Sequence, residues 1–313
     1  MEELTKPIQG VSLLGLPAAL TDELVENAKR KQVSSGGASC AIGALTEFVH
    51  NGSAARANRS LADVSEGNSS RLSAYLAVGA LSPRQVYHEA KGKEGCEWLI
   101  CHMEMRDFFI YYSFLMGIDA FCRDEPRGKL YTVEWKSIRS ESGCETFTKW
   151  STGKTGLPLI DAAMTELVQT GYCSNRVRQN VASLLSKDLR LDWRAGAEFF
   201  QICVEDHCVA ANYGNWSYFS GVGSDPKCRH FRTVSQARRY DQKGEYVRKW
   251  LPALRNQQDP EVCLRPWDFL QDWPETIVDV KTQMTWQDSQ KFENEPTKQF
   301  EGLADCTSLR LQG

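Results

Sequence analysis

Apolar residues recur three or four positions apart along most of this 313-residue chain, which places them on one face of an α-helix. Runs that alternate Val, Ile or Thr with polar residues, as half-buried strands do, are missing, and there is no β-α-β rhythm. The predicted fold class is therefore all-α. The predicted helices cover residues 21–31, 38–50, 95–118, 158–171 and 174–189.

Helix-start signals refine this pattern. Ser69 and Ser70 precede Leu72 and are predicted to cap a short helix, and Ser82 with Pro83 begins the next one. A serine-rich helix start presents free N–H groups and hydroxyls, which suit an anion such as a diphosphate. Plain capping explains the same residues, so both interpretations stay open.

The densest stretch runs from residue 192 to residue 224. We expect one buried helix over 199–211, ending near Gly214 because Asn-Tyr-Gly-Asn tolerates left-handed backbone. An acidic pair, Glu205 and Asp206, lies inside this apolar run. Since buried polar groups need partners, a polar ligand or a nearby arginine is implied.

Three parts are predicted: an N-terminal extension or linker over 1–35, a helical domain over 36–260, and an acidic C-terminal extension over 261–313. The net charge is −3, but residues 226–255 hold nine Lys/Arg against two acidic residues. Residues 256–313 hold five basic and eleven acidic residues. The basic run suits either phosphate contact or an ordinary solvated face.

Eleven cysteines are scattered without a C-x-x-C pair, and there are only five histidines. This usage favours free thiols in a reducing compartment (cytoplasm, nucleus or organelle) over a disulfide framework, and no metal site is predicted. No run of eighteen apolar residues predicts a membrane span. The start M-E-E-L-T-K-P does not read as a signal or transit peptide.

Charged residues inside apolar helices are the next candidates. Arg106 and Asp107 lie in the middle of the 95–118 helix, where they either pair with each other or face a ligand's phosphate. Arg176 and Arg178 lie in a helix's first turn, where the helix dipole disfavours cations, so outside partners are implied. The segment W-S-T-G-K-T-G is not a phosphate-binding P-loop, because Thr148 stands where that pattern needs glycine.

Three motifs together resemble one family. K-W-S-T-G-K-T-G-L-P-L-I-D-A-A-M, S-N-R-V-R-Q-N-V-A-S and A-A-N-Y-G-N-W-S-Y-F-S-G-V-G-S-D-P closely resemble the FAD-binding domain of photolyases and cryptochromes. The N-Y-G-N-W form, with Tyr218 two residues after Trp216, points to the DASH-type branch. The family's amino-terminal antenna domain has no counterpart in the sequence, and another domain or protein is expected in its place.

The resemblance implies one non-covalently bound FAD. The implied diphosphate contacts are Ser69, Ser70, Arg71, Leu72 and Ser73, with Arg106 facing a phosphate. The implied isoalloxazine contacts are Asn175, Arg178 paired with Asp206, and Asn212 beside flavin N5. A neighbour of this kind tunes which redox state of the flavin is stable.

The resemblance also assigns electron transfer and DNA contact. Trp216 and Trp193 match the proximal and middle members of the tryptophan chain, and Trp135 is the candidate for the distal member. Core packing is the alternative for each indole. The implied DNA contacts are Arg176, Tyr218 and Arg232, within or beside the basic 227–249 region.

Several positions depart from the repair enzymes. Met105 replaces a tryptophan that stacks on the lesion, His102 replaces an acidic or amide residue, and Cys208 replaces an aspartate near the flavin. The loop before Ser69 carries Arg56 and Arg59 where an aromatic residue is expected. Three functions therefore stay open: light-driven repair of cyclobutane pyrimidine dimers in single-stranded DNA, blue-light signalling without a substrate, and a scaffold that has lost FAD.

Overall fold

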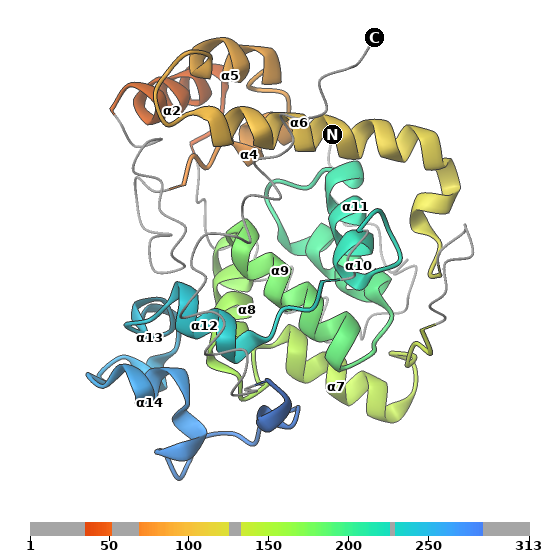
Figure 1. Cartoon of the computed structure of the whole chain (residues 1–313), viewed down its shortest axis with the longest axis vertical. Helices are drawn as coiled ribbons and strands as arrows, with labels where there is room; N and C mark the ends of the chain where they lie inside the picture. The colour runs from red at the N-terminus through yellow and green to blue at the C-terminus, as the bar shows by residue number, and fades with distance from the viewer. Residues whose placement is uncertain (1–34, 52–68, 125–132, 226–228, 284–313) are drawn as a thin grey trace, which may run out of the picture.

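A computed structural model describes residues 35–51, 69–124, 133–225 and 229–283. Within those ranges it contains helices and turns, together with one isolated parallel bridge between Lys136 and Leu191 (Figure 1). The predicted all-α class is confirmed. The predicted helix over 21–31 and the end of the acidic extension lie outside the described ranges.

A smaller core forms at the N-terminal end of the described chain. It comprises α2 (Ala38–His50), α4 (Ser73–Ala77), α5 (Pro83–Ala90) and the start of α6 (Glu97–Met116), which gather at the top of Figure 1. The predicted 38–50 helix is present, although Ala41 is buried and Ile42 is 46% exposed. The predicted Ser82 cap of α5 is also present, as a capping box with Gln85.

A larger core contains the remaining helices and the largest buried side chains, among them Trp150, Trp193 and Phe199. Its α-helices are α7 (Glu141–Ser151), α8 (Pro158–Thr170), α9 (Asn175–Ser183), α10 (Trp193–Cys203), α11 (Val209–Ser220), α12 (Thr233–Tyr240), α13 (Glu245–Trp250) and α14 (Pro260–Leu264). Short turns of other helix types complete the fold: η3 (Gly117–Phe121), η4 (Leu184–Asp188), η5 (Pro252–Leu254), η6 (Pro266–Asp268) and η7 (Val280–Gln283).

The single helix expected over 199–211 is wrong, because the chain forms two helices there. Val204 has extended backbone and ends α10, and the amide of Glu205 donates to the carbonyl of Gly171. The helix α11 then continues through Gly214 and ends at Gly221, which has left-handed backbone. Gly214 serves close packing, since a Cβ there would overlap the ring of Phe109 on α6.

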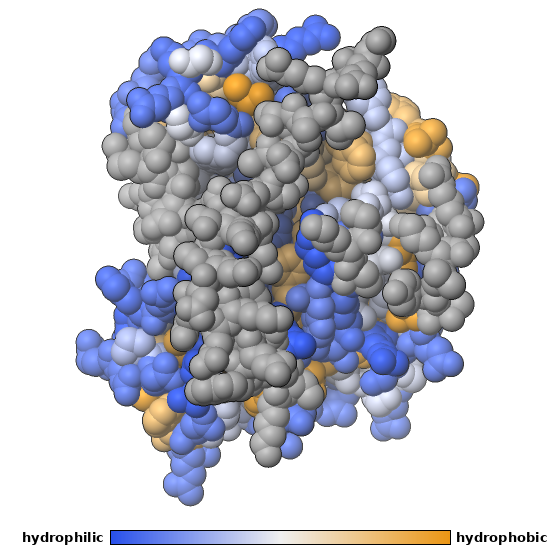
Figure 2. Space-filling model, viewed as in Figure 1, coloured by the Kyte–Doolittle hydropathy of each residue, from blue (hydrophilic) through white to orange (hydrophobic). Residues whose placement is uncertain are grey.

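Two further expectations are corrected. Ser69 and Ser70 do not cap α4, because Leu72 occupies the N-cap position and makes no side-chain cap. The helix α6 is not mostly buried: among its residues only Leu99 and Phe109 are classed as buried. Phe114 is 80% exposed, and an apolar surface lies at the upper right of Figure 2, over the end of α6. The helix α6 therefore packs through residues such as Phe109 and leaves other apolar side chains, such as Phe114, exposed.

The described start of the 261–313 segment packs against the larger core. Cys263 and Leu264 on α14 are buried in it, and the indole of Trp273 donates to the carbonyl of Gly156 at 2.9 Å. The beginning of this segment is therefore part of the folded helical body.

A buried carboxyl group joins α8 to α13. Glu166 accepts a hydrogen bond from the hydroxyl of Tyr246 at 2.6 Å and is 2% exposed. Burial raises the pKa of Glu166 from its ordinary 4.5 to about 7, against the opposing effects of Tyr246 and nearby cations. Near neutral pH this carboxyl therefore gains and loses a proton.

We expect Glu166→Gln to flatten the dependence of stability on pH. The folded chain holds the Glu166 proton more tightly than the unfolded chain, so this group stabilises the fold below about pH 4.5. The contribution, on the order of 3 kcal/mol, is lost as pH rises through about 7. Urea unfolding between those limits measures it, and the exposed Glu245→Gln on α13 is the control. Equal slopes in wild type and Glu166→Gln would contradict the assignment.

We expect Gly196→Ala to lower the free energy of unfolding by about 1–3 kcal/mol, because a Cβ there would overlap the ring of Trp216. Gly43→Ala on α2 is the matched control, since no heavy atom lies within 4 Å of its added Cβ. That change should be neutral or stabilise by about 0.5–1 kcal/mol. Chemical denaturation of both variants measures their free energies of unfolding. Similar changes in the two variants would mean that α10 and α11 do not approach each other this closely.

Candidate functional site

Polar side chains of the segment 69–71, next to the smaller core, contact the larger core. The hydroxyls of Ser69 and Tyr172 are hydrogen-bonded at 2.9 Å, and the guanidinium of Arg71 lies 4.8 Å from the centre of the Tyr172 ring. Arg71 has a φ of 46°, a left-handed conformation that is uncommon for a residue with a side chain. This backbone is therefore held in place by its contacts, which is frequent at ligand sites.

Arg178 and Asp206 form a bidentate ion pair. Two guanidinium nitrogens donate to the two carboxylate oxygens at 3.0 and 2.9 Å, and Nε donates to the carbonyl of Cys173 at 2.8 Å. The Asp206 side chain is 6% exposed and that of Arg178 is 26% exposed. The pairing implied by the resemblance is confirmed, and it fixes the start of α9 against the loop between α10 and α11.

Asn212 lies on α11 with its side chain turned towards α10. Its Nδ2 donates to the carbonyl of Ala197 at 2.8 Å, which leaves the amide oxygen as the acceptor for another group. In the preceding loop, both ring nitrogens of His207 are buried and have no hydrogen-bond partner within the described chain. Burial lowers the pKa of His207, although Asp206 opposes this, so the neutral ring is favoured.

Arg106 pairs with its neighbour Asp107 at 3.2 Å, and its side chain is 27% exposed. It precedes Phe109 by one turn of α6, and Phe109 packs against Gly214 of α11. The structure thus shows the pairing alternative, and Arg106 lies on the side of α6 that faces the Asn212 helix. A phosphate contact by this guanidinium stays a prediction.

The other implied cofactor contacts differ in exposure. Ser70 is half-buried, whereas Ser73 and Asn175 are exposed at the starts of α4 and α9. The Leu72 side chain is 1% exposed inside the smaller core. Leu72 therefore presents almost no surface to a ligand.

These residues fit a large, anionic, polar cofactor such as FAD. Hydroxyl and guanidinium donors come from Ser69, Arg71 and Arg178, and an amide acceptor comes from Asn212. The buried His207 nitrogens lack partners in the described chain, and polar groups in that state are explained by a ligand or water. Diphosphate, ribityl and flavin groups are chemically suited to such a set.

Trp216 and Trp193 are buried at the contact of α10 and α11. Trp216 lies over Gly196, with its ring 5.2 Å from that of Phe200 and 6.1 Å from that of Trp150. Gly196 is one turn from Trp193 on α10, and the Trp193 indole donates to the carbonyl of Arg123 at 3.0 Å. The two indoles therefore occupy consecutive positions along one helix contact.

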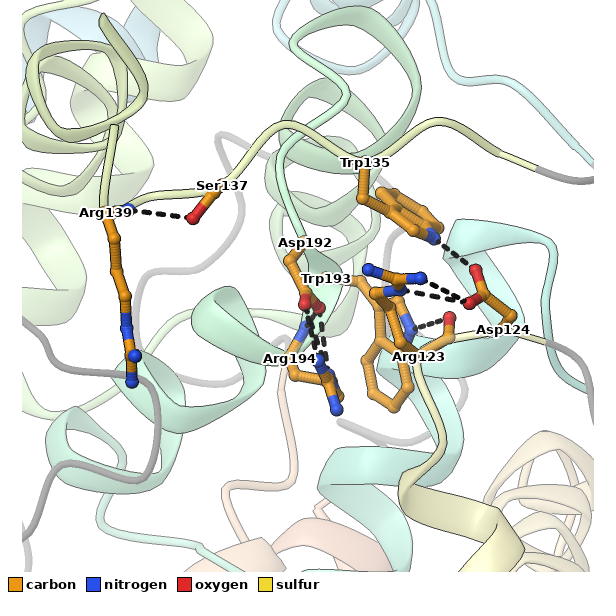
Figure 3. Close-up of polar contacts among 8 residues, drawn as sticks. All are labelled: Arg123, Asp124, Trp135, Ser137, Arg139, Asp192, Trp193 and Arg194. Carbon is orange, nitrogen blue, oxygen red and sulfur yellow. Dashed lines mark hydrogen bonds and ion pairs between the residues drawn. The ribbon is translucent and has the colours of Figure 1, made fainter. Parts of the chain in front are cut away.

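Trp135 is half-buried, and its indole donates to the carboxylate of Asp124 at 3.1 Å (Figure 3). Trp135 and Trp193 thus contact two adjacent residues, Arg123 and Asp124. The bridge between Lys136 and Leu191 brings the two backbone segments together as well. Of the three predicted tryptophans, Trp216 and Trp193 are thus buried and Trp135 is half-buried, and Trp216 lies one turn after Asn212 on α11.

The residues implied in DNA contact are more dispersed. The guanidinium of Arg176 lies 4.5 Å from the centre of the Tyr240 ring, at the end of α12, whereas Arg232 precedes the start of that helix. Tyr218 on α11 is hydrogen-bonded to Arg229. Arg176 and Arg232 thus lie near opposite ends of α12, and Tyr218 packs against the larger core.

Sequence reasoning missed Tyr172, His207 and the Arg123–Asp124 pair. Tyr172 follows Gly171 at the end of α8, and His207 follows the recognised Asp206, so each stands beside a residue with a stronger signal. A scan for polar or aromatic residues next to helix-terminal glycines would have found Tyr172. Arg123 and Asp124 carry no local signal, since their role comes from contacts with tryptophans far along the chain.

No described helix is long and apolar enough to cross a membrane. No group of three His, Cys, Asp or Glu side chains in that part of the protein could hold a metal ion.

Comparison with known proteins identifies the family. The sequence model for the FAD binding domain of DNA photolyase matches residues 99–291, more than half of the chain. A Cryptochrome DASH from Synechocystis sp. is 41% identical over 207 residues, which are 64% of this chain and 41% of that protein. A Cryptochrome DASH from Gloeobacter violaceus is 35% identical over 289 residues, 85% of this chain and 55% of that protein.

Comparison with solved structures indicates the same family. The crystal structure of the Synechocystis cryptochrome matches with a TM-score of 0.71 and 31% identity, over 92% of this chain and 58% of that one. An archaeal photolyase from Sulfolobus tokodaii, solved with two FAD molecules, matches with a TM-score of 0.68 and 27% identity, over 83% and 56%. The chain thus spans 41% to 58% of the length of these relatives. It belongs to the photolyase/cryptochrome family and corresponds to that family's FAD-binding domain.

Proposed function

We propose that this domain is a blue-light-responsive flavoprotein whose FAD is photoreduced through Trp216, Trp193 and Trp135. The observation that carries the proposal is the series of indoles from the α10–α11 contact to the half-buried Trp135. When bound, FAD supplies light absorption and one-electron chemistry. The protein's share is to hold the cofactor, to position the indoles and to limit water at the inner ones, which are 4% and 0% exposed.

Each site residue has a defined part in this proposal. Ser69, Arg71 and Arg106 contact the diphosphate, and Arg178, held by Asp206, contacts the isoalloxazine. Asn212 presents its amide oxygen towards the flavin, with its orientation fixed by the bond to Ala197. Indole is readily oxidised, and each inward electron step restores the inner member at the expense of the next one outward.

We further propose light-driven repair of cyclobutane pyrimidine dimers in single-stranded DNA as the activity of this site. Arg176, Tyr218 and Arg232, with the basic 227–249 region, would contact the phosphate backbone. Blue-light signalling without a substrate is the second candidate, because Met105 and His102 replace residues that contact the lesion in repair enzymes. Repair of a dimer-containing single-stranded oligonucleotide by the illuminated protein separates the two.

A partner surface also belongs to this proposal. We propose that another domain or protein packs against this domain. The exposed apolar residues of α6, including Tyr111, Phe114 and Leu115, support such packing.

We expect Trp193→Phe and Trp216→Phe to retain FAD but to slow its photoreduction at least tenfold, since phenylalanine is much harder to oxidise. Absorption under blue light with dithiothreitol measures the rate, and Trp267→Phe is the control because Trp267 is outside the proposed series. Dimer repair by chemically pre-reduced protein should be unaffected by either change. Wild-type rates in both variants would contradict the electron path.

We expect Arg178→Ala to lose FAD, but the variant also leaves the Asp206 carboxylate buried without its partner, which costs about 3–5 kcal/mol. The double variant Arg178→Gln with Asp206→Asn removes both charges and keeps similar shapes. Circular dichroism should show it folded, and flavin absorbance should show at least tenfold weaker retention. Full FAD content in the folded double variant would exclude Arg178 from the site.

A further inference from the structure

The ring of Tyr213 lies beside Trp193, the middle member of the proposed series of indoles. Tyr213 follows Asn212 on α11, and the centres of the Tyr213 and Trp193 rings are 6.3 Å apart, with their planes at 75°. An edge-to-face contact of this kind is a favoured arrangement of two aromatic rings. Tyr213 is half-buried, whereas Trp193 is 0% exposed. The contact therefore leads from a buried indole to a phenol nearer the surface.

Three contacts hold the Tyr213 side chain. Its ring packs edge-on against Trp193 and against Phe121 of η3, whose ring centre is 5.0 Å away. Its hydroxyl donates to Oε1 of Gln201 at 3.2 Å, and Gln201 is exposed on α10. The two ring contacts fix the plane of the phenol, and the hydrogen bond directs its O–H towards the surface. A phenylalanine would fill the same space, so ring packing alone does not account for the hydroxyl.

The phenol of Tyr213 is neutral before it reacts. Burial raises the pKa of Tyr213 above its ordinary 10.0, and the Glu198 carboxylate raises it further, against the opposing effect of Arg194. An indole radical cation is oxidising enough to take an electron from a phenol, provided that the phenol can release its proton. The hydrogen bond to the exposed Gln201 brings the O–H to a place where water can accept that proton.

We propose that Tyr213 is a second electron donor to oxidised Trp193, beside Trp135, and that it becomes a neutral tyrosyl radical. The inference rests on the proposed photoreduction, which withdraws one electron from Trp193. Tyr213 then gives one electron to the indole radical cation, its O–H proton passes to water beside Gln201, and the neutral indole is restored. A thiol reductant such as dithiothreitol later returns one hydrogen atom to the tyrosyl oxygen and leaves as a thiyl radical.

This branch slows the return of the electron. A tyrosyl radical recovers its electron together with a proton, because the phenolate that would otherwise form is disfavoured by burial and by the carboxylate of Glu198. The proton has by then been released to water, so recombination depends on its recapture. Tyr213 therefore prolongs the charge separation that light produces.

The test uses FAD-loaded protein exposed to a light flash, with the radicals identified by electron paramagnetic resonance. Ring-deuterated tyrosine changes the hyperfine pattern of a tyrosyl radical and leaves that of a tryptophan radical unchanged. We expect a tyrosyl signal in wild type, slower formation of it in heavy water, and its loss in Tyr213→Phe. Phenylalanine keeps the ring contacts, so this variant should fold. Tyr87→Phe on α5, where Tyr87 is 38% exposed, is the matched control and should keep the signal.

Trp135→Phe tests whether Tyr213 is a branch at Trp193 or an extension beyond Trp135. The tyrosyl signal should persist in this variant, because Tyr213 contacts Trp193 directly. Loss of the signal in Trp135→Phe would overturn the proposal.

Two other results would also overturn the proposal while the photoreduction stands. One is the formation of tryptophan radicals in wild type with no tyrosyl signal, and the other is a tyrosyl signal that survives in Tyr213→Phe. Absence of every protein radical in wild type would instead refute the photoreduction through the indoles, and the proposal with it.

Discussion

The close approach of three helices, α6, α10 and α11, sets the geometry on which the site depends. Gly196 lets the Trp216 ring lie directly on α10, and Gly214 lets the Phe109 ring lie directly on α11. Any side chain at either glycine would push the helices apart. The same two contacts place Asn212 against the carbonyl of Ala197 and bring the Arg106 face of α6 towards α11. The close contacts at Gly196 and Gly214 therefore determine both the packing of these helices and the positions of the candidate site residues.

The second requirement is that two separate cores be held together by polar contacts. Ser69 and Arg71 reach from the smaller core to Tyr172, and Arg178 secures the neighbouring loop through Asp206. A buried ion pair contributes little net stability compared with an apolar pair, but it fixes one arrangement and is costly to break from one side. Such contacts suit a site that must hold a charged cofactor between two bodies.

The predictable part of this protein is local. The limits of α8 were predicted closely, because they depend on residues close together in the sequence. These are its spaced apolar residues, the proline at its start and Gly171, which has left-handed backbone, at its end. The break between α10 and α11 was not, because it depends on Glu205 bonding to Gly171, more than thirty positions away. The helix end predicted at Gly214 was wrong for the same reason. Gly214 is required by the distant ring of Phe109, but in the sequence it resembles a glycine that ends a helix. Motif resemblance supplied the Arg178–Asp206 pair, which periodicity alone left open.

The departures from the repair enzymes also have a structural basis. His102 packs edge-on against Trp98, 5.2 Å away, and Trp98 packs in the same way against Phe48 at 5.8 Å. The position at which the resemblance implies a lesion contact is thus part of an aromatic cluster that joins α2 to α6. The α10–α11 contact keeps its indoles and its asparagine. Substitution has therefore altered the surface proposed to meet DNA more than the interior proposed to move electrons, and these two functions are separable in this fold.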